Sequence, residues 1–136
     1  MADTIAERIG WRAGRRVLFY GIGNVGRQDD GLGIRLVERL EEAGLPSGVD
    51  FEANYQLNVE DALLISDYDT VVFVDASREP GAPAPFVIRE LQPVAELTFS
   101  THAMSPAAVL SLCEEIYQVK PSAWLLALPG YDWGIS

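Results

Sequence analysis

The chain has 136 residues, 49% of them hydrophobic, which is enough for one domain with a single packed core. Acidic residues outnumber basic ones by 20 to 10, and the formal charge of −10 argues against a nucleic-acid partner because phosphate groups would be repelled. No signal peptide is expected from the N-terminal residues, no apolar stretch reaches the roughly 20 residues that cross a bilayer, and Cys113 is the single cysteine. These features predict a cytoplasmic protein without an intramolecular disulfide and without a membrane partner.

The N-terminal third predicts an arm, a strand and a helix. Residues 1–15 have mixed character and are expected to form a loose arm or a short helix, ahead of an α/β domain over residues 16–136. The apolar run at residues 17–20 predicts a buried strand. From Gly33 onward, apolar residues recur at helical spacing, and they predict a helix that ends at Gly44.

The middle of the chain predicts two strands with a helix between them. Residues 49–53 are expected to form a second short strand, and Asn58 is expected to cap a helix that continues to about residue 66. The run at 70–74 is β-branched and apolar on both faces, which predicts a central, parallel strand. Residues 77–85 hold three prolines and a glycine, and they predict a loop.

The last third predicts a strand, a helix and a final strand. Residues 86–88 are expected to form a strand at an edge of the sheet, and residues 123–128 the last strand. Ser105 followed by Pro106 is typical of a helix start, with the serine as cap and the proline in the first turn. The buried stripe of this helix is expected to comprise Val109, Leu112, Cys113 and Ile116.

The alternation of strands and helices predicts a single-domain, three-layer α/β/α fold around a mostly parallel, twisted sheet. In such sheets, sites form beyond the carboxyl ends of the strands. The turn at residues 21–30 follows the first strand, Asn54 follows the second and Asp75 follows the third. We therefore expect these residues to meet at one edge of the sheet, with the segment that carries His102 as a further candidate.

The glycine-rich turn after the first strand permits two interpretations. Residues 21–26 satisfy the G-x-G-x-x-G spacing of dinucleotide-binding domains, whose backbone amides approach a pyrophosphate, and Glu52 ends the next strand where a ribose-binding acid would stand. Asp29 and Asp30 follow at the positive end of the predicted helix, where they would repel a phosphate. A small nucleotide-binding domain is therefore the weaker alternative.

Two carboxylates and an imidazole are candidates for a metal site. One carboxylate of the Asp29–Asp30 pair suffices to cap the helix, which leaves the other to face the crevice. Asp75 is either a turn residue or a site residue, and His102, the only histidine, is either a structural hydrogen-bonding residue or a ligand. Together they suit a borderline divalent ion such as nickel or zinc. Because Asp30, Asp75 and His102 are far apart in sequence, this hypothesis depends on the fold.

Four segments of the chain carry a resemblance to a known family. They are Gly21-Ile-Gly23-Asn24, Asp29-Asp30-Gly31-Leu-Gly33-Ile, Val74-Asp75-Ala76 and Ser100-Thr101-His102. In order and separation they resemble the hydrogenase maturation endopeptidases, from about residue 16 to the end of the chain. The resemblance implies a small α/β protease that removes a C-terminal peptide from the precursor of a nickel-iron hydrogenase large subunit once nickel is in place.

The resemblance also implies roles for individual residues. The family's catalytic and metal-contacting positions fall on Asp30, Asp75 and His102, and the metal is nickel supplied by the substrate, with cadmium or zinc as other occupants of the site. Two routes of hydrolysis stay open: the metal polarises a carbonyl or activates water, or one aspartate acts as a general base. Substrate contacts are expected from Asn24, Asp29, Asn54, Gln56 and Glu60.

Two features depart from the family pattern. Residues 54–57 and Glu60 replace an Asp-Gly-Gly-Thr-like stretch of many members, and they resemble a branch with a Gln-Leu pattern that is associated with bidirectional or NAD-linked hydrogenases. Residues 131–136 resemble the loop before the family's final helix, and that helix is expected to be absent.

The alternative function is a nickel-dependent checkpoint or chaperone that binds the loaded precursor without cutting it.

Overall fold

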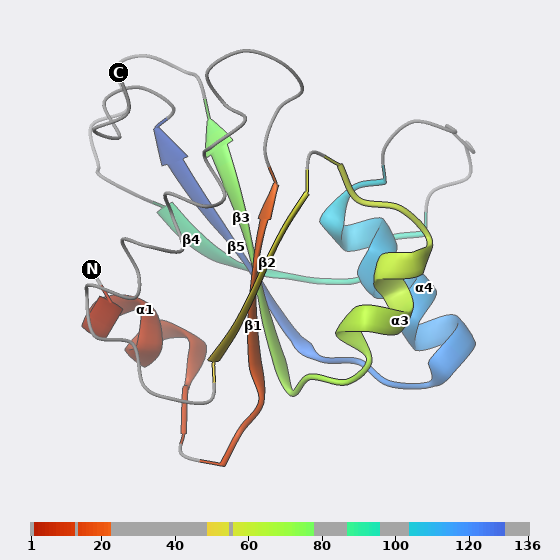
Figure 1. The fold of residues 1–136 in the computed structure, drawn as a ribbon, viewed down its shortest axis with the longest axis horizontal. Helices are drawn as coiled ribbons and strands as arrows, with labels where there is room; N and C mark the ends of the chain where they lie inside the picture. Colours follow the sequence, from red (N-terminus) through yellow and green to blue (C-terminus); the bar gives the residue numbers. More distant parts are fainter. Residues whose placement is uncertain are drawn as a thin grey trace.

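The polypeptide folds around one sheet, with helices on both of its faces (Figure 1). The computed structural model describes residues 2–12, 14–22, 49–54, 56–77, 87–95 and 104–129. The helix predicted from Gly33 to Gly44 lies outside these ranges.

The strands of the sheet are β1 (Val17–Ile22), β2 (Val49–Asn54), β3 (Thr70–Ser77), β4 (Val87–Leu91) and β5 (Ser122–Pro129). Across the described residues the sheet has five strands in the order β2-β1-β3-β5-β4. β1 pairs in parallel with β2 and β3, and β3 pairs in parallel with β5, whereas β4 runs antiparallel to β5 at the edge. The prediction of a mostly parallel sheet is therefore confirmed.

Two hydrophobic cores lie on opposite faces of the sheet, because successive side chains of a strand point to opposite sides. On β1, Tyr20 enters one core and Phe19 enters the other. The helices α3 (Glu60–Ile65) and α4 (Pro106–Tyr117) cover the first face, and α1 (Ala2–Ile9) covers the second (Figure 1). The three-layer α/β/α arrangement that the sequence predicted is confirmed.

The helix α1 occupies part of the region that was expected to form an arm or a short helix. Its Ile5 and Ile9 are buried and pack in one cluster with Phe19 of β1. The guanidinium of Arg8 donates a hydrogen bond of 3.2 Å from Nη2 to the carbonyl oxygen of Ile88 in β4. The N-terminal residues therefore contribute to the core of the molecule.

The start of α4 agrees with the sequence-based prediction, whereas the predicted burial in its last turn does not. The Oγ of Ser105 accepts a hydrogen bond of 3.1 Å from the N–H of Ala108, and Pro106 is in the first turn. Cys113 is buried, as predicted. The prediction for Ile116 is wrong, because its side chain is 54% exposed. Burial along α4 ends at Cys113, so the last turn of the helix is exposed.

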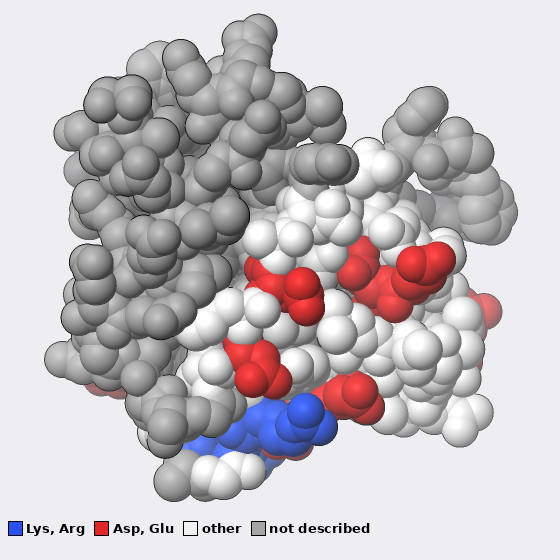
Figure 2. Space-filling model, viewed as in Figure 1, with Lys and Arg blue, Asp and Glu red and all other residues white. Residues whose placement is uncertain are grey.

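Exposed carboxylates gather over β2 and α3, whereas the basic side chains visible in the same view lie at one end of the molecule (Figure 2). Arg16 lies at that basic end, where β1 begins, and its guanidinium stacks over the ring of Tyr68 at 5.0 Å from the centroid. In the described part of the chain, no helix has both the length and the apolar character needed to cross a membrane.

Candidate functional site

The carboxyl ends of the parallel strands place polar residues in one row. In the sheet register, Ile22 at the end of β1 pairs with Asn54 of β2 and with Asp75 of β3. Asp75 pairs in turn with Ala127 of β5. Adjacent strands lie about 4.8 Å apart, so roughly 10 Å separates the backbones of Asn54 and Asp75. The fold thus brings together two of the residues that the sequence assigned to this edge.

The remaining members of the predicted metal site are not among the described residues. The backbone of Asp75 is described, and it lies near the carboxyl end of β3. The joint geometry of Asp30, Asp75 and His102 therefore stays a prediction. Within the described ranges, no group of three or more His, Cys, Asp or Glu residues is arranged to hold a metal ion. The predicted site residues that lie outside those ranges are Asn24, Asp29, Asp30 and His102.

Three predicted substrate contacts lie on the segment that follows β2. Asn54 ends the strand, Gln56 lies in a bend, and Glu60 is the first residue of α3. All three are exposed, so a bound partner can reach them. Asn58 was predicted to cap the helix, but the N-cap position is Val59, which makes no side-chain cap hydrogen bond. Asn58 precedes it, and its Oδ1 accepts a hydrogen bond of 2.9 Å from the N–H of Glu60. This bond holds the start of α3 next to the exposed segment.

A backbone contact joins this segment to the start of α4. The N–H of Met104 donates a hydrogen bond of 3.2 Å to the carbonyl oxygen of Leu57, and the two residues form an isolated antiparallel bridge. Leu57 is only 1% exposed, so the bridge is anchored in the core. Met104 follows His102 by two positions in the sequence. The bridge therefore ties the residues after β2 to the segment that leads from His102 into α4.

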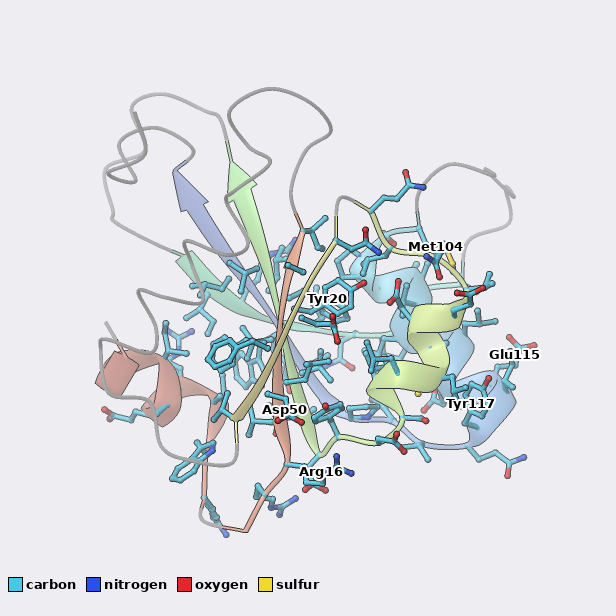
Figure 3. The ribbon with its side chains drawn as sticks, viewed as in Figure 1. Arg16, Tyr20, Asp50, Met104, Glu115 and Tyr117 are labelled. Atoms are coloured by element: carbon cyan, nitrogen blue, oxygen red, sulfur yellow. The ribbon has the colours of Figure 1, made fainter. Side chains whose placement is uncertain are left out.

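A buried hydrogen-bond network joins the segment after β2 to β1. The hydroxyl of Tyr20 in β1 donates a hydrogen bond of 2.8 Å to Oδ1 of Asp61 in α3. The N–H of Asn58 donates another, also of 2.8 Å, to Oδ2 of the same carboxylate. Asp61 is 7% exposed, and both of its oxygens are satisfied by protein groups. Figure 3 shows Tyr20 on the face of the sheet that carries α3 and α4, with Met104 near the start of α4.

The surroundings of Tyr20 hold its hydroxyl in the protonated form. Burial is the main cause that raises the pKa of Tyr20 above its ordinary value, and the hydrogen bond to Asp61 and the charge of that carboxylate add to the effect. A side-chain hydrogen bond with Asn54 acts in the opposite direction. The hydroxyl therefore stays a donor to Asp61 at physiological pH while it also contacts a predicted substrate-binding residue.

The role of this network was not predicted from the sequence. The run at residues 17–20 predicted a buried strand and assigned no partner to Tyr20. Two features of the sequence could have indicated it. Asp61 lies on the same helical face as the apolar residues Ala62 and Ile65, and Tyr20 is the polar member of an apolar strand. A buried charge requires a partner, and a buried tyrosine hydroxyl is a common one. The two residues are 41 positions apart, so the pairing itself required the fold.

Solved structures with the same architecture include several maturation peptidases. A NiFe hydrogenase maturation protease, HycI from Thermococcus kodakarensis KOD1, is 27% identical to the chain, with a TM-score of 0.60 over 92% of this chain and 80% of that one. The resemblance to hydrogenase maturation proteases is confirmed. The hydrogenase 2 maturation peptidase from Thaumarchaeota archaeon SCGC_AB-539-E09 is 24% identical, with a TM-score of 0.52 and coverages of 90% and 84%. HybD, a hydrogenase maturating endopeptidase from E. coli, is 24% identical, with a TM-score of 0.54 and coverages of 84% and 74%.

The likeness to the hydrogenase maturation proteases is structural. No protein-family model and no curated protein sequence matches the chain. The likeness to HycI nevertheless extends over most of both chains, so it includes the sheet and is not limited to one motif. The carboxyl edge of the sheet, with Asn54 and Asp75 in one row, is consequently the place to look for function.

Proposed function

We propose that the protein is an endopeptidase that removes the C-terminal peptide from a nickel-loaded hydrogenase large-subunit precursor. The structural likeness to the maturation protease HycI carries this proposal, because at 27% identity it extends over 92% of the chain. The position of Asp75 at the carboxyl edge of the sheet is consistent with it, since sites in parallel sheets form at that edge.

In this proposal Asp30, Asp75 and His102 recognise the metal that the precursor carries. Two carboxylates that share a site repel each other, so a site of this kind attracts a cation. An imidazole adds a ligand that suits nickel or zinc better than magnesium or calcium. A precursor that already holds nickel supplies the cation, and an empty precursor does not. The three side chains would thus select the loaded precursor, with the nickel belonging to the substrate.

The segment after β2 would contact the polypeptide of the precursor. Asn54, Gln56 and Glu60 are exposed next to the carboxyl edge, and together they offer amide and carboxylate groups for an extended peptide. The acidic side chains over β2 and α3 would favour a basic or metal-bearing partner over an acidic one (Figure 2).

A processing assay tests the proposal. Purified protein is incubated with nickel-loaded and with nickel-free precursor, and the mass of each precursor is measured before and after. Loss of a C-terminal peptide from the loaded precursor alone supports the proposal. Loss from both precursors contradicts the nickel dependence. Binding of the loaded precursor without a change in mass contradicts the protease and supports the checkpoint or chaperone.

A further inference from the structure

We propose that Tyr20 and Asp61 are positioning residues for the reaction, because their buried hydrogen bond holds the backbone that anchors the segment leading to His102. This inference rests on the proposed function, in which His102 belongs to the reacting site. It adds residues that do not touch the substrate but act through the segment after β2 and its bridge to Met104.

Burying the carboxylate of Asp61 costs free energy. A carboxylate that is 7% exposed is tolerated only where its oxygens are hydrogen-bonded. The hydroxyl of Tyr20 occupies one oxygen and the N–H of Asn58 occupies the other, each at 2.8 Å. A fully satisfied buried network is rigid, because moving any member leaves a charge unpaired. The backbone at Asn58 is consequently held against β1.

Backbone and one hydrogen bond connect Asn58 to the start of α4. Leu57 precedes Asn58, and its carbonyl oxygen accepts the hydrogen bond from the N–H of Met104. A displacement of Asn58 would therefore move the acceptor of this bond. Met104 is two residues after His102, which limits how far the imidazole can lie from the bridge. The hydroxyl of Tyr20 is thus connected to the segment that carries His102 through three hydrogen bonds and two short pieces of backbone.

The ring of Tyr20 has a separate, structural role that the test must leave intact. It packs in the core beside Phe73, with the two ring centroids 6.1 Å apart. Tyr20→Phe keeps this packing and removes only the hydroxyl. Asp61→Asn is the second variant, because it retains the size of the side chain but presents an amide donor to a network that needs acceptors.

The chain contains a matched control for this substitution. Tyr68 also donates a hydrogen bond from its hydroxyl to an aspartate, Asp50, at 2.7 Å. That pair lies at the opposite edge of the sheet, where β2 and β3 begin, and it is exposed. Tyr68→Phe therefore removes the same chemical group from the same kind of bond, at the end of the sheet opposite the segment after β2.

The experiment measures kcat and KM for processing of the nickel-loaded precursor, together with the imidazole signals in a proton–nitrogen NMR spectrum at fixed pH. Because His102 is the only histidine, its signals are unambiguous once any affinity tag is removed. We expect Tyr20→Phe to lower kcat roughly tenfold with KM changed less than about twofold, since small misplacements of reacting groups reduce rates strongly. The His102 signals should shift, and Asp61→Asn should change both readouts in the same direction.

Tyr68→Phe is expected to leave kcat and the His102 signals as in the unmodified protein. The inference is overturned if Tyr20→Phe processes at the normal rate, or if Tyr68→Phe loses as much activity as Tyr20→Phe. If the unmodified protein does not process the precursor while Tyr20→Phe still shifts the His102 signals, the proposed function fails and the coupling between Tyr20 and His102 stands. These two failures are therefore distinguishable.

Discussion

Among single residues, two described aspartates accept hydrogen bonds from tyrosine hydroxyls in different surroundings. Asp61 is buried and is bonded through both of its oxygens, whereas Asp50 accepts its bond from Tyr68 at the exposed surface. Both bonds come from tyrosine hydroxyls at nearly equal distances, so the difference between them is burial. Burial increases the cost of an unpaired group, and this makes the Tyr20–Asp61 bond the more consequential one.

Replacing His102 with alanine is expected to abolish processing and to leave the fold unchanged, because the proposed function requires the imidazole to contact the substrate's nickel. Processing is measured by the mass of the nickel-loaded precursor, and the fold by far-ultraviolet circular dichroism. Glu115→Ala, an exposed change on α4, serves as the control and should process normally. Normal cleavage by the His102 variant would remove this residue from the site.

The two hydrogen-bonded tyrosines are expected to make stability depend on alkaline pH. Burial is the main cause that raises the pKa of Tyr68 to about 12, with the hydrogen bond to Asp50 adding to it, and the pKa of Tyr20 is raised as well. A folded-state pKa above the unfolded value of about 10 contributes stability that is complete below that pH and is lost as the pH rises toward the folded value. The free energy of unfolding should therefore fall above about pH 10.

The test compares urea unfolding of the unmodified protein and of Tyr68→Phe between neutral pH and about pH 11. The variant lacks one of the two tyrosines, so its stability should decrease less steeply over the alkaline range. Parallel curves for the two proteins would show that the Tyr68–Asp50 bond does not contribute to this dependence.

Among the elements, short apolar runs predicted β1, β3, β4 and β5, whereas β2 alternates apolar and acidic residues. Residues buried on both faces of a parallel sheet must be apolar in succession, and this leaves a signal that does not depend on distant partners. The end of α4 was less predictable. Ile116 continues the apolar spacing of the helix but is exposed, because helical spacing indicates a common face and not where along the helix burial ends.

Ser105→Ala is expected to destabilise the protein by about 1 kcal/mol, because the serine hydroxyl caps α4 and alanine leaves the N–H of Ala108 without this acceptor. The free energy of unfolding is measured with urea. Ser111→Ala, within the same helix, is the matched control and should have little effect, since alanine is favoured in helix interiors. Equal losses in both variants would contradict the assignment of the cap.

In the molecule as a whole, helices cover both faces of the sheet, with α3 and α4 on one face and α1 on the other. α1 closes the second core through Ile5 and Ile9, and a hydrogen bond from Arg8 fastens it to β4. The residues of α1 therefore shield from solvent one face of β1 and β3, the strands that end at Ile22 and near Asp75.

Ile5→Ala is expected to destabilise the protein by roughly 2–5 kcal/mol, because the side chain is fully buried and its removal leaves a cavity against β1 and β3. Glu7→Ala, an exposed change on the same helix, should alter the free energy of unfolding by less than about 0.5 kcal/mol. Urea unfolding measures both. A small effect of Ile5→Ala would mean that α1 does not contribute to the core as described.

Patterns in the sequence were enough to predict the strands, the three-layer class and the cap of α4, because each leaves a signal in residues that are close together in the chain. They also indicated that Asn54 and Asp75 would meet at the carboxyl ends of parallel strands. The strand order, the register that places both beside Ile22, and the partner of Tyr20 became known from the fold alone. These features depend on contacts between residues far apart in sequence, which no local pattern specifies.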